Sequence, residues 1–383
     1  IMTINKYRGF TLRNFKNIPQ IGSLSQEDIE AINIVGQVLP FKVNNYVTDE
    51  LIDWNNIPDD PIFTLTFPRR EMLSEENYNK VSELLATSDK ATLIKAIHNI
   101  RMQLNPNPAG QKKNIPTVDG QQLHGMQHKY RETALFFPSQ GQTCHAYCTF
   151  CFRWPQFSGM SGLKFAMREA DLLHKYLLTD KNITDVLFTG GDPMTTTAKV
   201  MSSYIEPLLD KKFSHIKNIR IGSKSLAYWP YRFLTDKDAD EMLLLFEKVK
   251  KAGKHLAFQA HFNHPTELST DAVKQAIERI QNTGAIIRTQ SPLLRYINDD
   301  YKIWKKMWTE QVRLGLIPYY MFVARDTGSK SFFEVPLAKS WEIYRDAIAA
   351  VSGIARTVRG PSMSAAPGKV QVLGVHKVNG EKV

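Results

Sequence analysis

The chain of 383 residues has only three cysteines and no apolar run that approaches the roughly 18 residues of a membrane-spanning helix. Three thiols cannot form a complete disulfide framework, which excludes a disulfide-stabilised secreted domain. The first ten residues, IMTINKYRGF, lack the apolar core of a signal peptide. We therefore expect a cytoplasmic protein without a membrane partner.

Acidic residues are outnumbered, since 49 Lys and Arg face 38 Asp and Glu and leave a net charge of +11. A basic protein attracts acidic ligands. The sequence nevertheless lacks a dense run of Lys and Arg, a zinc-finger spacing and an RNA-recognition signature. We interpret the charge as a solvated basic surface and expect no nucleic-acid partner.

All three cysteines, Cys144, Cys148 and Cys151, lie in the stretch CHAYCTFC with the spacing C-x3-C-x2-C. A Cys-x-x-Cys redox pair would leave Cys144 without a role, and a structural zinc site takes four protein ligands. Three thiolates on one short loop instead suit a [4Fe–4S] cluster, which then keeps one iron open for a ligand that is not protein.

From about residue 133, short apolar runs rich in β-forming residues alternate with helical segments. The predicted strands are 133–138, 184–190, 218–223, 255–262, 285–290 and 318–324, and the predicted helices include 164–178, 196–209 and 238–252. Six such units predict an α/β fold whose parallel sheet closes, or nearly closes, into a barrel with the helices outside. The alternative is a doubly wound open sheet, but no G-x-G-x-x-G follows the first strand.

The segment before about residue 115 has a different pattern. Helices are predicted at 23–35, with Ser25 as the N-cap, at 75–89 and at 90–104, while FTLTFPRREM is predicted to be extended. The loop NPNPAGQKKNIP leads into the barrel. We divide the chain into a mainly helical lobe at 1–115, a barrel at 116–350 and a C-terminal segment at 351–383, and we find no catalytic signature in the first.

The cysteine spacing resembles that of the radical S-adenosylmethionine (SAM) enzymes, and further motifs narrow the resemblance. HKY, CFR, GGD, RIGS, HFNHP, QSPLLRYIND and PYY follow one another as in the lysine 2,3-aminomutase family, over roughly residues 58–370. The resemblance implies a partial (βα)6 TIM-like barrel and a [4Fe–4S] cluster whose open iron binds SAM. It also implies an isomerase that moves an amino group from the α to the β carbon of an amino acid with the help of pyridoxal phosphate (PLP).

The motif positions identify candidate site residues by the same resemblance. The cysteines are the cluster ligands, and the further candidates around the cluster and SAM are Tyr147, Gly190, Gly191, Asp192, Ser223, His261 and Gln290. Lys369, in RGPSMSAAPGKV, matches the lysine that carries PLP, and Lys129 and Tyr130 match residues at its phosphate. Arg153 matches the arginine that binds the substrate carboxylate. The alternative for Lys369 is a surface lysine after a Pro-Gly turn.

Two positions depart from the lysine-specific members of the family. Their aspartates, which hold the distal ammonium group of lysine, are replaced here by Ser362 and, by strict spacing, by Arg325, with Asp326 one residue later. A buried ammonium group without a partner is costly. We therefore expect an amino acid substrate other than free lysine, with Arg325 and Asp326 near it.

The resemblance also implies an electron donor such as flavodoxin or ferredoxin, and a homo-oligomer. Two alternatives stay open. One is radical chemistry without PLP on the same scaffold, and the other is a noncatalytic iron–sulfur or nucleic-acid-binding protein.

Overall fold

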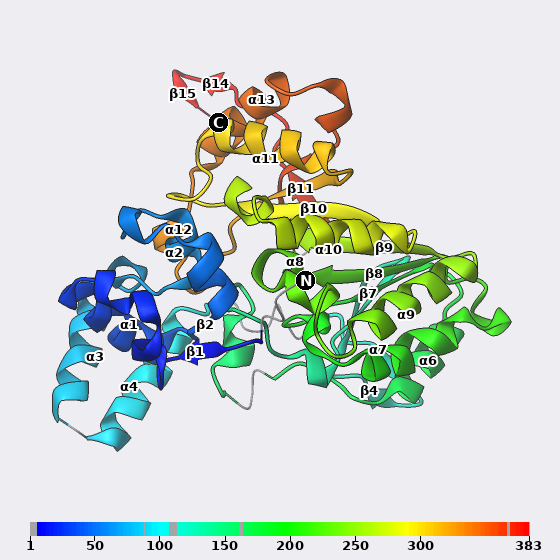
Figure 1. Cartoon of the computed structure of the whole chain (residues 1–383), viewed down its shortest axis with the longest axis horizontal. Helices are drawn as coiled ribbons and strands as arrows, with labels where there is room; N and C mark the ends of the chain where they lie inside the picture. The colour runs from blue at the N-terminus through cyan, green and yellow to red at the C-terminus, as the bar shows by residue number, and fades with distance from the viewer. Residues whose placement is uncertain (1–5, 88, 107–112, 161–163, 366–367, 383) are drawn as a thin grey trace.

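The fold is taken from a computed structural model that describes residues 6–87, 89–106, 113–160, 164–365 and 368–382. A mainly helical N-terminal region lies to one side of a large sheet whose outer face carries helices (Figure 1). Part of the predicted loop at 105–116 and of the predicted turn before Lys369 lies outside the described residues.

The main sheet has nine strands among the described residues, in the order β13-β12-β11-β10-β9-β8-β7-β6-β5. Strands β6 to β12 run parallel, while β5 and β13 run antiparallel to their neighbours at the two edges. Their bounds are β5 Met126–Tyr130, β6 Thr133–Phe136, β7 Asp185–Phe188, β8 Asn218–Ser223, β9 His255–His261, β10 Ile286–Leu293, β11 Ile317–Val323, β12 Arg359–Ala365 and β13 Gly368–Gln371. The six predicted strands are confirmed, and the unpredicted β12 makes the barrel-like sheet more nearly closed.

Helices cover the outer face of this sheet (Figure 1). They are α6 Ala170–Thr179, α7 Ala198–Ile205, α9 Ala239–Lys251, α10 Asp271–Asn282, α11 Tyr301–Arg313 and α13 Leu337–Ala349. Two short helices are placed differently: α8 Ser225–Tyr228 is buried after β8, and α12 Lys330–Phe333 contacts the 3₁₀ turn Arg70–Met72 of the N-terminal region. In β8, Ile219 and Ile221 are buried and the intervening Arg220 is half-buried. Because successive side chains of a strand point to opposite faces, the apolar set packs beneath the helices and the polar set lines the inside of the barrel.

The N-terminal region packs α1 Gln26–Val38 against α3 Glu75–Thr87 and α4 Lys90–Gln103, beside a hairpin of β1 Gly9–Thr11 and β2 Lys42–Asn44. All three predicted helices are confirmed. Ser25 is the N-cap of α1, and its hydroxyl accepts a hydrogen bond from the Asp28 N–H at 3.1 Å. The Asp28 carboxylate accepts from the Ser25 N–H in return, which completes a capping box.

Two predicted elements are wrong in part. The helix predicted from residue 164 begins at Ala170, because Met167 pairs with Pro138 in a parallel bridge and continues the edge beside β6. Within FTLTFPRREM, predicted to be extended, 63–66 form the end of α2 Pro61–Thr66, Phe67 is extended, and Arg70–Met72 form a 3₁₀ turn. The preceding Asp60 caps that helix by accepting from the Phe63 N–H at 2.7 Å, and Pro61 stands at its first position.

Small hairpins complete the fold, namely β3 Thr117–Val118 with β4 Gln121–Gln122, and β14 Lys377–Val378 with β15 Glu381–Lys382. The division at residues 115 and 350 stays a prediction, and β12 and β13 from the C-terminal segment belong to the barrel sheet. None of the helices in the described part of the chain combines the length and apolar character that crossing a bilayer needs.

Candidate active site

The cysteine loop follows β6, at the rim where the parallel strands end. All three thiols are free. Burial raises the pKa of Cys148 to about 12 and that of Cys151 to about 11. Burial also raises the pKa of Cys144, and the nearby Asp192, Cys151 and Cys148 add to the rise. The three thiols are therefore close enough to act on one another.

The loop suits a cluster better than a single metal ion. No three Cys, His, Asp or Glu side chains in the described ranges are gathered as the ligands of one ion would be. In a cubane cluster each thiolate binds a different iron, which keeps the sulfur atoms further apart. A cation acts on each thiol, since Lys42, Lys224 and Arg153 each lower the pKa of one of them. The residues present fit a [4Fe–4S] cluster, which when bound supplies the electron that cleaves SAM.

Gly190 and Gly191 follow β7 and lie against the start of the cysteine loop. A Cβ on Gly191 would come within 2.5 Å of the Thr143 carbonyl oxygen. The N–H of the next residue, Asp192, donates to the carbonyl oxygens of Gly141 at 2.9 Å and Thr143 at 2.7 Å. Backbone packs on backbone here, so only glycine fits, and the GGD motif holds the cysteine loop in place.

The carboxylate of Asp192 is buried and fully engaged. One oxygen accepts from the Met194 N–H at 2.9 Å. The other accepts from the Ser223 hydroxyl at 3.0 Å, the Lys224 N–H at 2.8 Å and the Ser225 hydroxyl at 3.1 Å. We predicted Asp192 and Ser223 as cofactor-binding residues; the structure places both in bonds that join the ends of β7 and β8.

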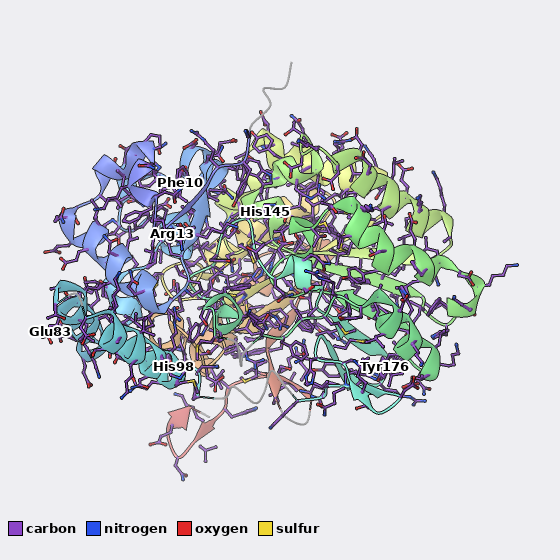
Figure 2. The ribbon with its side chains drawn as sticks, turned by 90° about the horizontal axis from the view of Figure 1, so that it is seen from below. Phe10, Arg13, Glu83, His98, His145 and Tyr176 are labelled. Atoms are coloured by element: carbon purple, nitrogen blue, oxygen red, sulfur yellow. The ribbon has the colours of Figure 1, made fainter. Side chains whose placement is uncertain are left out.

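Three N-terminal residues, Tyr7, Lys42 and Asn44, hold the cysteine loop from outside the barrel, and we call them the N-terminal strap. The Tyr7 hydroxyl donates to the His145 carbonyl at 2.7 Å, and Asn44 Nδ2 donates to the same oxygen at 3.1 Å. Lys42 Nζ donates to the Cys144 carbonyl at 2.8 Å. Figure 2 shows His145 between the N-terminal region and the barrel. Sequence reasoning missed the strap because each bond joins residues more than 100 positions apart.

Tyr147 and Phe150 line the loop on its other sides. The Tyr147 ring stacks on the Phe157 ring with centroids 4.8 Å apart. The backbone N–H of Tyr147 donates to the Lys42 carbonyl oxygen at 2.8 Å. The Phe150 ring meets His261 edge-on at 5.8 Å. These contacts fix the Tyr147 ring against Phe157, and its predicted role beside the cofactor stays a prediction.

His261 and Gln290 stand opposite each other on β9 and β10 and face the inside of the barrel. Burial lowers the pKa of His261 well below its usual range, and Lys224 adds to the effect, so its ring is neutral. Its Nε2 is buried and has no hydrogen-bond partner among the described residues. A buried polar atom without a partner marks a place where a ligand atom would be favourable.

Lys224, in the GSKS motif, forms a buried ion pair that we did not predict. Its Nζ lies 2.7 Å from Glu267 Oε1, and the two side chains are 10% and 0% exposed. The same Nζ donates to Asn263 Oδ1 at 2.8 Å. Lys224 directly follows β8, while Glu267 lies in the turn Pro265–Leu268 after β9, so no signal in the sequence pairs them. The pair joins the ends of β8 and β9 below the cysteine loop.

Two of the three residues predicted near the substrate, Arg153 and Arg325, lie near the Phe152 ring. The guanidinium of Arg153 lies 4.9 Å from that ring and that of Arg325 lies 5.5 Å from it. Burial lowers the pKa of Arg153 to about 10, so it stays charged at neutral pH. Arg153 forms no ion pair with any residue that the structure describes, while Arg325 and Asp326 are exposed.

Lys369 lies on β13, and its Nζ is 4.0 Å from the ring centroid of Tyr320 and 4.9 Å from that of Phe322. Lys129, on β5 at the opposite edge of the sheet, donates to the carbonyl oxygens of Ala365 and Gly368. The structure therefore brings Lys129 to the facing ends of β12 and β13, next to Lys369.

Tyr130 and Tyr320 accompany these two lysines. The Tyr130 ring lies 5.5 Å from Lys129 Nζ and is 37% exposed. Tyr320 is hydrogen-bonded to Arg359. Burial would raise the pKa of Tyr320, but Lys369 and Arg359 outweigh burial and lower it. We call the place where Lys129 of β5 meets the facing ends of β12 and β13, at Ala365 and Gly368, the seam.

The chain is similar to several aminomutases. It is 31% identical over 367 residues to a protein of Aquifex aeolicus (strain VF5) provisionally named L-lysine 2,3-aminomutase. That alignment covers 96% of this chain and 86% of the Aquifex protein. It is 25% identical over 345 residues to the L-lysine 2,3-aminomutase of Bacillus subtilis (strain 168). That alignment covers 90% of this chain and 63% of the Bacillus protein.

No family model matches the chain. Among solved structures, a radical SAM methyltransferase from Sphaerobacter thermophilus aligns with 63% of this chain and 71% of its own at 13% identity and a TM-score of 0.43, too distant to add to the argument. The likeness to the Aquifex protein along nearly the whole chain shows that this protein belongs to the lysine 2,3-aminomutase family of radical SAM enzymes.

Proposed function

We propose that this protein is a PLP-dependent 2,3-aminomutase that acts on an acidic amino acid and not on free lysine. Family membership implies the cluster and SAM, whereas PLP and the substrate are argued from the residues of this chain. The observation that carries the proposal is the convergence of Lys129 and Lys369 at the seam.

Lys369 is placed to hold PLP, which when bound supplies an electron-accepting ring to the migrating amino group. Strands β12 and β13 are antiparallel, and Lys369 of β13 stands directly opposite Ser364 of β12. Directly opposite residues of such a pair point to the same face of the sheet, so these two side chains share a face. Tyr320 keeps the lysine amine against its ring. Lys129 brings a positive charge to the seam, where a phosphate would compete with the two carbonyl oxygens that Lys129 now contacts.

Arg153 is placed to bind the substrate carboxylate. The half-buried guanidinium of Arg153 has its pKa lowered by burial and forms no ion pair in the described structure, and a carboxylate supplied from outside would offset that cost. Its planar fork suits two carboxylate oxygens. Arg153 follows Cys151 by two residues, so this contact would hold the substrate beside the cluster loop.

Ser362 and Arg325 argue against lysine as the substrate. The Ser362 hydroxyl is buried and has no hydrogen-bond partner among the described residues. It pairs with Phe322 of β11, on the sheet edge that carries Lys369. A neutral hydroxyl cannot offset a buried ammonium group, while Arg325 and Arg359 supply charges that an acidic side chain would match.

A borohydride trap tests the PLP assignment. The protein is purified without oxygen, supplied with iron, sulfide and PLP, reduced with borohydride and digested for mass spectrometry. We expect a pyridoxyl adduct on Lys369 in the wild type, no adduct in Lys369→Arg, and an unchanged adduct in Lys377→Arg as the matched control. If Lys369 stays bare while the cluster still cleaves SAM, PLP-free radical chemistry replaces the proposal.

A substrate screen tests the charge argument. Glutamate, aspartate, lysine and arginine are each supplied to the loaded enzyme, and β-amino products are measured. We expect turnover of an acidic amino acid, and Arg325→Glu should reduce it. Good turnover of lysine or arginine with no acidic product would refute the acidic substrate.

A further inference from the structure

A groove of about 620 Å³ opens on the outside of the barrel and has no part in the proposed aminomutase chemistry. It lies between the 3₁₀ turn Pro265–Leu268 and the helices α10 and α11. Helix α10 packs on β10 and α11 on β11, and both helices contact the turn Pro265–Leu268. Four lysines line it: Lys274 from α10, and Lys302, Lys305 and Lys306 from α11.

The groove is strongly positive. Residues three and four apart lie on one face of a helix, so the three lysines of α11 stand together. None of the four forms an ion pair with a residue that the structure describes. The one acid in the lining, Glu310, is held by Arg313 through two hydrogen bonds of 2.8 and 2.5 Å. Lys274 and Lys302 lie in the first turns of their helices, where the peptide dipoles add positive charge.

The groove lies at the same rim of the barrel as the cysteine loop. Helices α10 and α11 begin after β9 and β10 end, so their first turns lie at the carboxyl ends of the parallel strands. The cysteine loop follows the end of β6 at that rim. Lysines in the first turns of these two helices therefore stand at the same rim of the barrel as the cysteine loop.

A short series of contacts leads from the groove to the cluster loop. The turn Pro265–Leu268 forms one wall, and its Glu267 points inward to Lys224 Nζ at 2.7 Å. That Nζ lies 4.3 Å from the ring centroid of Tyr228, whose hydroxyl is 3.8 Å from Cys148 Sγ. Three contacts thus connect the wall of the groove to a cluster ligand.

We propose that this lysine groove docks an acidic one-electron carrier protein and is the entry point for the electron that reduces the cluster. The carrier loses one electron and the oxidised cluster gains it, and no covalent bond forms or breaks. Charge complementarity selects the carrier, because a positive surface steers an acidic protein to one face of the molecule. The inference rests on the cluster that the family implies and on neither PLP nor the substrate.

Cluster reduction by two reductants tests the proposal. The cluster-loaded full chain is mixed without oxygen with reduced flavodoxin, an acidic carrier, or with dithionite, and cluster bleaching and the paramagnetic signal of the reduced cluster are followed. The groove variant is K302E/K305E/K306E. The matched control is K80E/K90E/K95E, which makes the same charge change at exposed lysines of α3 and α4, far from the groove (Figure 1).

At low ionic strength flavodoxin should reduce the groove variant about tenfold or more slowly than the wild type or the control variant. The difference should shrink as salt screens the charges. Dithionite should reduce all three proteins at the same rate, which shows that the cluster is intact. Equal flavodoxin rates for the wild type and the groove variant overturn the proposal, as does an equal loss in the control. Lysine-dependent binding of a labelled oligonucleotide without a flavodoxin effect also overturns it.

Discussion

Replacing Glu267 by Gln should destabilise the protein severely, because it leaves the Lys224 charge buried without its counter-charge. Breaking a buried ion pair on one side costs about 3–5 kcal/mol. Lys224 keeps Asn263 Oδ1 at 2.8 Å and the His261 carbonyl at 3.3 Å as acceptors. These neutral contacts offset part of the loss, so we expect a decrease of about 3 kcal/mol in the free energy of unfolding.

The measurement is urea denaturation of the apoprotein, with Glu206→Gln as the matched control. Glu206 pairs with Lys248 at 2.6 Å, but these side chains are 42% and 58% exposed, so its loss should cost less than about 1 kcal/mol. Removing both buried charges in Lys224→Met with Glu267→Gln should cost less than the sum of the single changes. If Glu267→Gln shifts the midpoint no more than Glu206→Gln, the buried pair does not stabilise the rim as argued.

Three further predictions concern the loop and the groove wall. Gly191→Ala places a Cβ 2.5 Å from the Thr143 carbonyl oxygen and should cost about 1–3 kcal/mol and lower the iron bound after reconstitution, measured by denaturation and iron assay. Unchanged iron content would contradict the close packing. Lys42→Met removes a charged hydrogen bond to the Cys144 carbonyl and should cost about 1.5–3 kcal/mol by the same denaturation, with Lys95→Met unchanged. Burial, and secondarily Lys306, lowers the pKa of His264 to about 4, whereas the unfolded chain binds this proton near pH 6.5. The free energy of unfolding should therefore fall by about 1.4 kcal/mol per pH unit as the pH drops from 6.5 to 4. The variant His264→Gln should lose this contribution to the pH dependence of stability. If its pH dependence equals that of the wild type, His264 does not titrate as argued.

Local patterns in the sequence determined the parts of this protein that local interactions form. The cysteine spacing places three thiols on one loop whatever surrounds them. The Ser25 N-cap and the alternation of 218–223 were readable because a cap and a strand depend on neighbours a few residues away. The order of the parallel strands follows from the order of the β-α units, since consecutive units lie side by side.

The tertiary structure decided what depends on residues far apart in the chain. Lys42 reaches Cys144 across 102 positions, and Lys129 reaches Gly368 across 239. No pattern along the sequence records such a contact, because folding alone brings the two backbones together. Asp192 shows the same limit, since its hydrogen bonds to the Met194 N–H, the Ser223 hydroxyl and the Lys224 N–H join two strand ends that the sequence pattern does not pair.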